Sequence, residues 1–137
     1  MKDFDKIFIP DGLKKESLKI RRSLIMEFYA SWIKENPSKA VWNDCLNDYI
    51  HIRFLSINET ISKASYSADS TRAVFRLTEI LKKSNIIKES PIKKNNKNQK
   101  QFERMLIMGY ENIRLVVGVQ RSNQNKVQYC ITAIHSK

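Results

Sequence analysis

Three apolar segments separated by short polar breaks fill the C-terminal part of the chain. They are Phe102–Met108, Ile113–Gln120 and Val127–His135. The last segment alternates, and four of its residues are expected on one face of a strand: Val127, Tyr129, Ile131 and Ala133. The breaks read GYEN and RSNQN, and polar breaks of this length with Gly or Asn are typical of hairpin loops. The pattern predicts a meandering antiparallel sheet with one face covered by helices from upstream.

Helical periodicity precedes these strands. Asp11 can cap a first helix that begins near Gly12. This helix should end at Asn36, because the residue before a proline avoids helical backbone. Pro37 then suits the first turn of a second helix, which would carry an apolar side. The residues on that side are Val41, Trp42, Cys45 and Leu46.

The middle of the chain is less uniform. Tyr49–Leu55 alternates and fits either a short strand or the end of the second helix. Ser56 and Glu59 form a capping box, which predicts a helix from Ile57. A further helix, capped by Asp69 or Ser70, should follow with the sequence STRAVFRLTEILKK. Residues 84–92 could add a short strand, which a proline would keep at an edge of the sheet.

These patterns predict one α+β domain over residues 1–137. Its mainly helical part, residues 1–83, would pack on a roughly four-stranded antiparallel meander sheet over residues 84–137. The N-terminus has no apolar signal segment and no run approaches the ~20 apolar residues of a membrane span. We therefore expect a cytoplasmic protein. Cys45 and Cys130 lie in apolar patterns and are expected to be buried free thiols.

The charge favours a polyanionic partner. Lys and Arg number 25 against 14 Asp and Glu, which gives a net charge of +11. Such a field attracts nucleic acid, although a lysine-rich protein with no such partner is the alternative. The segment from Lys82 to Arg104 contains eight basic residues and two acidic ones. Its centre, KKNNKNQK, has no apolar residue and must be a solvated loop. This loop either binds phosphates electrostatically or is a mobile polar hairpin loop without that role. The expected phosphate contacts are Lys93, Lys94, Lys97, Lys100, Arg104 and Lys126.

Common catalytic motifs are absent from the sequence. It contains no Gly-rich phosphate loop, no HExxH, no GxSxG, no zinc-type Cys/His spacing and no acidic cluster typical of two-metal nucleases. We expect neither a metal nor another cofactor. Metal-free RNA cleavage needs only a base, an acid and a cation. The histidines available are His51 and His135, and either could instead be an ordinary surface residue.

Two stretches resemble a known group of nucleases. They are SINETISKASYSADSTRAVFRLTEIL (Ser56–Leu81) and LVVGVQRSNQNKVQYCITAI (Leu115–Ile134). Together with the basic surface and the helices-then-sheet order, they resemble the barnase, EndoU, colicin and RelE group, in particular its phage-associated and polymorphic-toxin members. The resemblance covers roughly the last 80 residues. It implies an active site on the exposed sheet face, with contributions from a preceding helix.

The resemblance also implies which residues would act. Its strand positions correspond to Arg121, Tyr129 and Thr132, and its helical positions correspond to Lys63, Ser67 and Arg72. The chain departs from the His-using members, because no histidine lies between Ser56 and Leu81. His51, just upstream, is the nearby substitute.

The residues themselves add constraints on these roles. Tyr129 belongs to the apolar alternation, which favours a place in the core over a catalytic role. Thr132 lies on the opposite face of a regular strand, so the two cannot share one site. Arg121 keeps its charge at any relevant pH and can only stabilise phosphate. The base would then be His51, Lys63 or a tyrosine.

Three functions fit the sequence. The first is a metal-independent endoribonuclease or toxin-like domain that acts on RNA rather than DNA, with an inhibitor or antitoxin protein as a further partner. The second is a nucleic-acid-binding module without turnover. The third is a protein-interaction or inhibitor module of phage or mobile-element origin. Binding that weakens steeply with salt separates the first two from the third, because it reports phosphate contacts.

Overall fold

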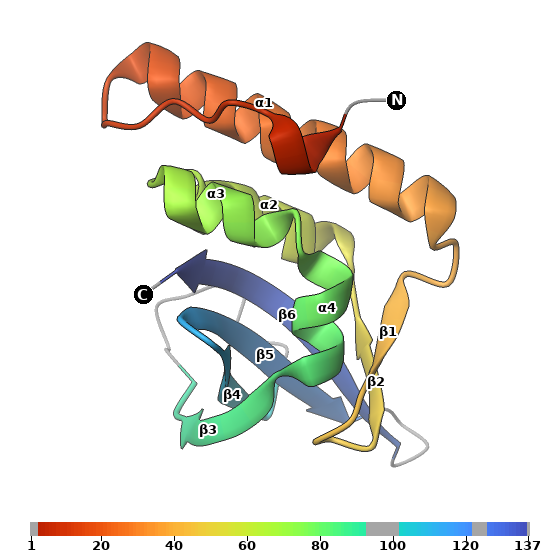
Figure 1. Cartoon of the computed structure of the whole chain (residues 1–137). Helices are drawn as coiled ribbons and strands as arrows, with labels where there is room; N and C mark the ends of the chain where they lie inside the picture. Colours follow the sequence, from red (N-terminus) through yellow and green to blue (C-terminus); the bar gives the residue numbers. More distant parts are fainter. Residues whose placement is uncertain (1–2, 93–101, 122–125, 137) are drawn as a thin grey trace.

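The computed structural model describes residues 3–92, 102–121 and 126–136, except for the side chains of residues 54–56 (Figure 1). The helices are the 3-10 helix η1 (Phe4–Lys6) and the α-helices α1 (Lys15–Glu35), α2 (Phe54–Ala64), α3 (Ala68–Val74) and α4 (Leu77–Lys83). The strands are β1 (Ala40–Asn43), β2 (Asp48–His51), β3 (Asn85–Ser90), β4 (Arg104–Tyr110), β5 (Ile113–Arg121) and β6 (Val127–Ser136). None of these described helices is long and apolar enough to cross a membrane.

The strands form one mixed sheet of six strands in the order β1-β2-β6-β5-β4-β3. β2 runs parallel to β6, whereas every other neighbouring pair is antiparallel. The fold is α+β, but the prediction of a roughly four-stranded antiparallel meander is wrong. Two strands from the first 83 residues extend the sheet beyond β6, so this part of the chain is not only a helical cover.

The error lies in residues 37–46, where the sequence predicted a second helix. The chain instead forms the β1–β2 hairpin, with Trp42 directly opposite Tyr49. Lys39 directly precedes β1 and Asn47 directly precedes β2, with φ of 53° and 55°, a backbone conformation that does not continue a helix. Val41 and Leu46 still pack against the main core, which is why their spacing imitated a helical stripe.

Asn43 connects this hairpin to the end of α4 through hydrogen bonds. Its buried side-chain amide donates to the carbonyl oxygens of Leu81, at 2.7 Å, and Ser84, at 2.9 Å. Its side-chain oxygen accepts a hydrogen bond of 2.7 Å from the backbone N–H of Leu46. A buried polar side chain is stable only when it is hydrogen-bonded, so these bonds fix the position of the turn between β1 and β2.

The other ambiguous segment, Tyr49–Leu55, is divided between two elements. The strand β2 ends at His51, and α2 begins at Phe54, earlier than the start at Ile57 that the capping box predicted. The expected single helix before β3 is two helices, α3 and α4. Ser67 caps α3 by accepting a hydrogen bond of 3.0 Å from the Ser70 N–H, so the expected caps at Asp69 and Ser70 are wrong.

The helices form two layers on one face of the sheet, as Figure 1 shows. α2 and α3 pack against β6, and α1 lies across α2 and α3. α1 begins at Lys15 without a side-chain cap, so the expected cap at Asp11 is wrong. Arg21 of α1 is fully buried and donates to the carbonyl oxygens of Pro10, Gly12 and Ser65, at 2.6–2.7 Å. These bonds hold the N-terminal segment and the α2–α3 turn against α1.

A bulge in β6 changes which side chains reach this core. Val116 is opposite Ala133 but Val117 is opposite Ile131, so β6 has one extra residue, Thr132, at this point. Ile131 and Ile134 therefore belong to the main core, whereas Ala133 does not. The expectation that Ala133 continues the core face is wrong because strict alternation stops at the bulge.

The sheet face away from the helices, here called the outer face, has a small apolar cluster of its own. Phe102, Met105 and Cys130 are its buried residues. The Phe102 ring lies directly on Gly118 of β5: a Cβ at this glycine would come within 2.6 Å of three ring atoms. The glycine therefore makes room for the Phe102 ring on this face.

This contact predicts that Gly118→Ala lowers the free energy of unfolding by about 1–3 kcal/mol, because the added methyl group overpacks the Phe102 ring. Gly109→Ala is the matched control. Its new methyl group would meet only the ends of the flexible Ile87 and Arg114 side chains, so a change within about 0.5 kcal/mol is expected. Urea unfolding of both variants measures the difference. Equal losses at the two positions would contradict this role of Gly118.

Candidate nucleic-acid interface

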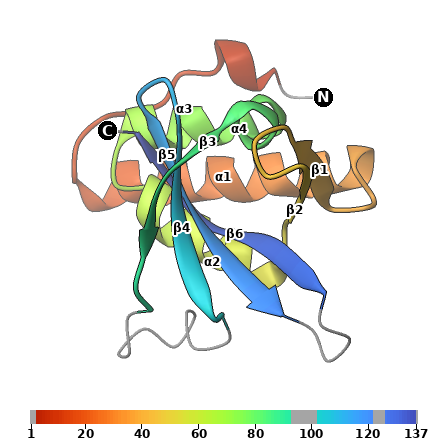
Figure 2. The same ribbon diagram turned by 90° about the horizontal axis from the view of Figure 1, so that it is seen from below.

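An exposed aromatic pair marks the β1–β2 side of the outer face. Trp42 and Tyr49 lie opposite each other, with ring centroids 5.2 Å apart and planes at 82°. Trp42 is 40% exposed and Tyr49 is 49% exposed, although both rings are large and apolar. Their neighbours Val41 and Ile50 pack into the core, so alternation directs the two rings to the other side of the sheet. Figure 2 shows this part of the sheet beside the start of β6.

A basic pair lies next to these rings on β2 and the residues after it. His51 ends β2 and is paired in register with Cys130 of β6. Arg53 follows two residues later, and its Nη2 donates to Oε1 of Gln128. Gln128 in turn is opposite Gln120 of β5. The parallel pairing of β2 with β6 therefore brings an imidazole, a guanidinium and two side-chain amides onto one surface.

The electrostatics of this surface keep His51 neutral. Burial lowers its pKa below the ordinary value of 6.5, the charge of Arg53 lowers it further, and Asp48 acts in the opposite direction. Burial also raises the pKa of the Cys130 thiol, with Arg53 opposing that shift. At neutral pH the site therefore presents a neutral imidazole beside a permanent cation, and Cys130 is a protonated thiol rather than a nucleophile.

The residues that the resemblance implied are not brought together. Tyr129 packs against the main core from β6. Thr132 is buried at the bulge, where its hydroxyl donates to the Val116 carbonyl oxygen at 3.0 Å. Lys63 lies exposed near the end of α2, close enough to His135 to contribute to the lowering of its pKa, after burial and the charge of Arg114.

The remaining two implied side chains also lie elsewhere. Arg72 of α3 donates to the Ile7 carbonyl oxygen at 3.3 Å and lines a hollow of about 250 Å³ between α3 and the end of β6. Arg121 ends β5 and forms an ion pair of 3.5 Å with Glu103. Of the six predicted catalytic residues, only His51 lies in the aromatic and basic surface described above. Catalytic roles for the others stay predictions that no contact in this surface supports.

Two of the predicted phosphate contacts fall at one end of the sheet. Arg104 begins β4 and pairs with Glu89 at 3.7 Å, and Lys126 is exposed just before β6. The other four lie outside the described residues: Lys93, Lys94, Lys97 and Lys100. Within the described part of the chain, no three His, Cys, Asp or Glu side chains are grouped so that they could hold a metal ion.

The sequence analysis missed Trp42, Tyr49, Arg53 and Gln128 as site residues. Their signal was present in the alternation of YIHIR, which directs Tyr49, His51 and Arg53 to one side of a strand. The partner strand was hidden because residues 37–46 were assigned to a helix. Of the two cysteines, which are both free thiols, Cys130 is buried as expected but Cys45 is exposed.

The histidines should make the fold sensitive to acid. Both have a lowered pKa in the folded chain, so the unfolded chain takes up protons first as the pH falls. Stability should therefore decline from about pH 6.5 downward. The double variant His51→Gln/His135→Gln removes both histidines of the chain and should lose less thermal stability between about pH 7.5 and pH 5 than the wild type. A larger loss in the double variant would contradict the direction of both shifts.

One comparison with known proteins identifies a family. The model of the family described as large polyvalent protein-associated domain 3 matches residues 25–129 of the 137. The matched region runs from the middle of α1 to β6 and includes the β1–β2 hairpin and Arg53. No curated protein and no solved structure matches the chain. The chain therefore belongs to the large polyvalent protein-associated domain 3 family.

Proposed function

We propose that the chain binds single-stranded RNA across the outer face of the sheet, over β1, β2 and the start of β6. The observation that carries this proposal is the exposed Trp42–Tyr49 pair beside Arg53. Proteins that bind single strands use aromatic rings on which bases stack and basic groups that follow the phosphates. Gln120 and Gln128 add amides that can hydrogen-bond to base edges or to the ribose.

The charge of the chain supports the same partner. A net charge of +11 attracts a polyanion from a distance, whatever the local contacts are. The resemblance to the barnase, EndoU, colicin and RelE group of nucleases favours RNA over DNA. Duplexes suit this surface less well, because their bases are already stacked and cannot lie on Trp42 and Tyr49.

Alanine substitutions of the two rings test the proposal. Trp42→Ala and Tyr49→Ala should each weaken binding of a fluorescently labelled single-stranded RNA by roughly 5- to 150-fold, the equivalent of about 1–3 kcal/mol for each stacked base. Tyr66→Ala is the matched control, because Tyr66 is a tyrosine 58% exposed in the turn between α2 and α3. Fluorescence anisotropy measures all three. Equal affinities for the wild type and the two ring variants would exclude this surface.

A second function, metal-free cleavage of the bound RNA, has one observation in its favour. His51 is held neutral beside the permanent charge of Arg53. A neutral imidazole can take the proton from a ribose 2′-hydroxyl, whose oxygen then attacks the adjacent phosphorus. Arg53 would stabilise the added negative charge on the phosphorane. The bond to the 5′-oxygen breaks, that oxygen takes a proton from solvent, and a 2′,3′-cyclic phosphate remains.

This chemistry predicts cleavage in EDTA with cyclic phosphate ends and a rate that rises with pH around a midpoint below 6.5, since burial and Arg53 lower the pKa of His51. His51→Gln should reduce the rate by about 100-fold or more and leave RNA affinity within about twofold. His135→Gln, which removes the other histidine, should cleave at the wild-type rate. Binding without any cleavage by the wild type would reduce the function to RNA binding alone.

A further inference from the structure

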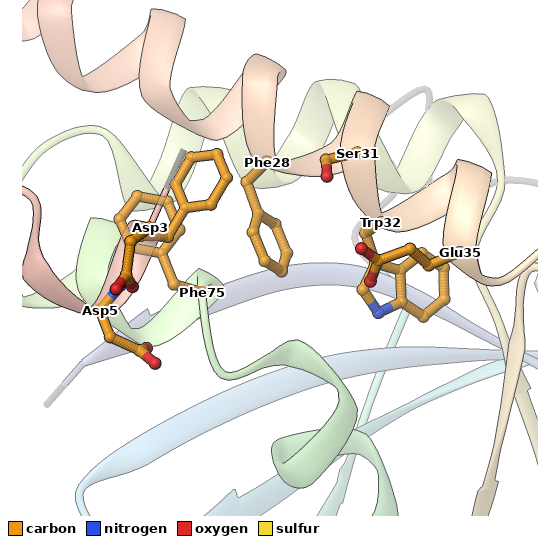
Figure 3. A pocket seen from close by; sticks show the side chains of 8 residues that line it. Asp3, Asp5, Phe28, Ser31, Trp32, Glu35 and Phe75 are labelled. Carbon is orange, nitrogen blue, oxygen red and sulfur yellow. The ribbon is translucent and has the colours of Figure 1, made fainter. Parts of the chain in front are cut away.

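An aromatic hollow lies on the other side of the molecule, among η1, α1 and the residues that join α3 to α4 (Figure 3). Its volume of about 360 Å³ is in the range of ligand pockets. Three phenylalanines pack together to form its apolar wall, with ring centroids 4.9–5.5 Å apart: Phe4, Phe28 and Phe75. A second hollow, lined also by Arg76, Thr78 and Glu79, extends the groove along α4. It shares five lining residues with the first: Asp5, Phe28, Trp32, Glu35 and Phe75.

Trp32 forms the other end of this wall. Its indole Nε1 donates to the Thr78 hydroxyl at 2.9 Å, which fixes the ring plane. Figure 3 shows Trp32 on the far side of Phe28 from Phe75, so the aromatic rings follow one another along the groove. The half-buried rings of Phe4, Phe28 and Phe75 offer apolar contact to a ligand and faces on which a cation can lie, whereas the Trp32 ring is buried.

The charges around the groove are opposite to those of the chain. The first hollow is lined by Asp3, Asp5 and Glu35, and no lysine or arginine lines it among residues 3–92, 102–121 and 126–136. In a chain with 25 basic and 14 acidic residues, such a surface is a local reversal of sign. Figure 3 shows Asp3 and Asp5 beside Phe75 at one end and Glu35 beside Trp32 at the other.

Few of these carboxylates are neutralised by neighbouring residues. Asp3 is 4.0 Å from the exposed Lys6. Asp5 and Glu35 form no side-chain hydrogen bond or ion pair with any residue in the described ranges 3–92, 102–121 and 126–136. Arg76, which lines the second hollow, is already engaged by Glu79 at 2.5 Å and Glu111 at 3.2 Å.

We propose that this groove binds a basic peptide segment of a protein partner, in which an apolar residue lies between two arginines or lysines. The apolar side chain would contact Phe28, and the two basic groups would reach the carboxylates at the two ends. Arginine suits such a groove because its guanidinium both pairs with carboxylates and stacks on aromatic faces. Nucleic acid is excluded as the occupant, because its phosphates would be repelled by Asp5 and Glu35. The groove is therefore a second surface, independent of the outer face.

Tryptophan fluorescence can test this directly. The Trp42→Phe variant leaves Trp32 as its one tryptophan, since the chain has two. The probe is the capped peptide Gly-Arg-Leu-Arg-Gly, which contains no fluorescent residue. We expect a saturable change in Trp32 emission with a Kd of about 1 mM or tighter, whereas Gly-Gln-Leu-Gln-Gly and Gly-Glu-Leu-Glu-Gly should produce none in this range. Long-range attraction cannot explain binding of a basic peptide, because the whole chain is positive.

Charge-neutral variants locate the contact. Asp5→Asn/Glu35→Gln should weaken binding of the arginine peptide about tenfold, up to about fivefold for each partly exposed ion pair. Asp11→Asn/Glu16→Gln makes the same change of charge at exposed residues outside the groove and should leave the Kd within about twofold. Equal weakening by both double variants would overturn the proposal. Absence of binding by the arginine peptide, or equally tight binding of the uncharged peptide, would also overturn it.

Discussion

The parallel pairing of β2 with β6 is the contact on which the rest of the arrangement depends. In the described part of the chain it joins two residue pairs, Ile50 with Tyr129 and His51 with Cys130. A two-stranded hairpin alone is marginal in water, so β1 and β2 gain their stability from this contact and from the bonds of Asn43 to the end of α4. The same contact decides the composition of the outer face. It adds Trp42, Tyr49 and His51 to the side chains of β3–β6 and Phe102 on this surface.

The two faces of the molecule are suited to different partners. The outer face combines exposed rings with Arg53, which matches the bases and phosphates of a single strand. The groove beside α1 combines rings with the carboxylates of Asp5 and Glu35, which have no ion-pair partner in the described part of the chain, and this matches a basic segment of a protein. Helices α2 and α3 separate the two surfaces (Figure 1). A partner could therefore occupy the groove without displacing RNA from the sheet.

The sequence predicted the C-terminal half of the fold better than the N-terminal half. Each strand from β4 to β6 has either clear alternation or a hydrophobic run bounded by polar breaks, and these signals are local. The β1–β2 hairpin was missed because Val41 and Leu46 would pack against the core from a helix as they do from the hairpin, so their spacing could not distinguish the two. The parallel pairing and the bulge at Thr132 depend on long-range contacts, which no local pattern encodes.

The candidate site was predicted only in part for the same reason. His51 could be selected from its chemistry, because the chain has two histidines. Arg53 and the Trp42–Tyr49 pair form one surface with Gln128 only when β2 lies beside β6. The resemblance to nucleases implied Tyr129 and Thr132 as site residues. Tyr129 instead packs against the core, and Thr132 donates its hydroxyl to the Val116 carbonyl oxygen at the bulge. A pattern shared with a divergent group of proteins does not fix which side of the strand each residue faces.

The most direct measurement of the central claim is an NMR titration of the ¹⁵N-labelled chain with a short single-stranded RNA. RNA bound across the outer face should shift the backbone amide signals of β1, β2 and residues 127–130. It should also shift the Trp42 indole signal and leave the Trp32 indole signal in place. Shifts centred on η1 and α1, or shifts spread evenly over every exposed lysine, would contradict the proposed surface.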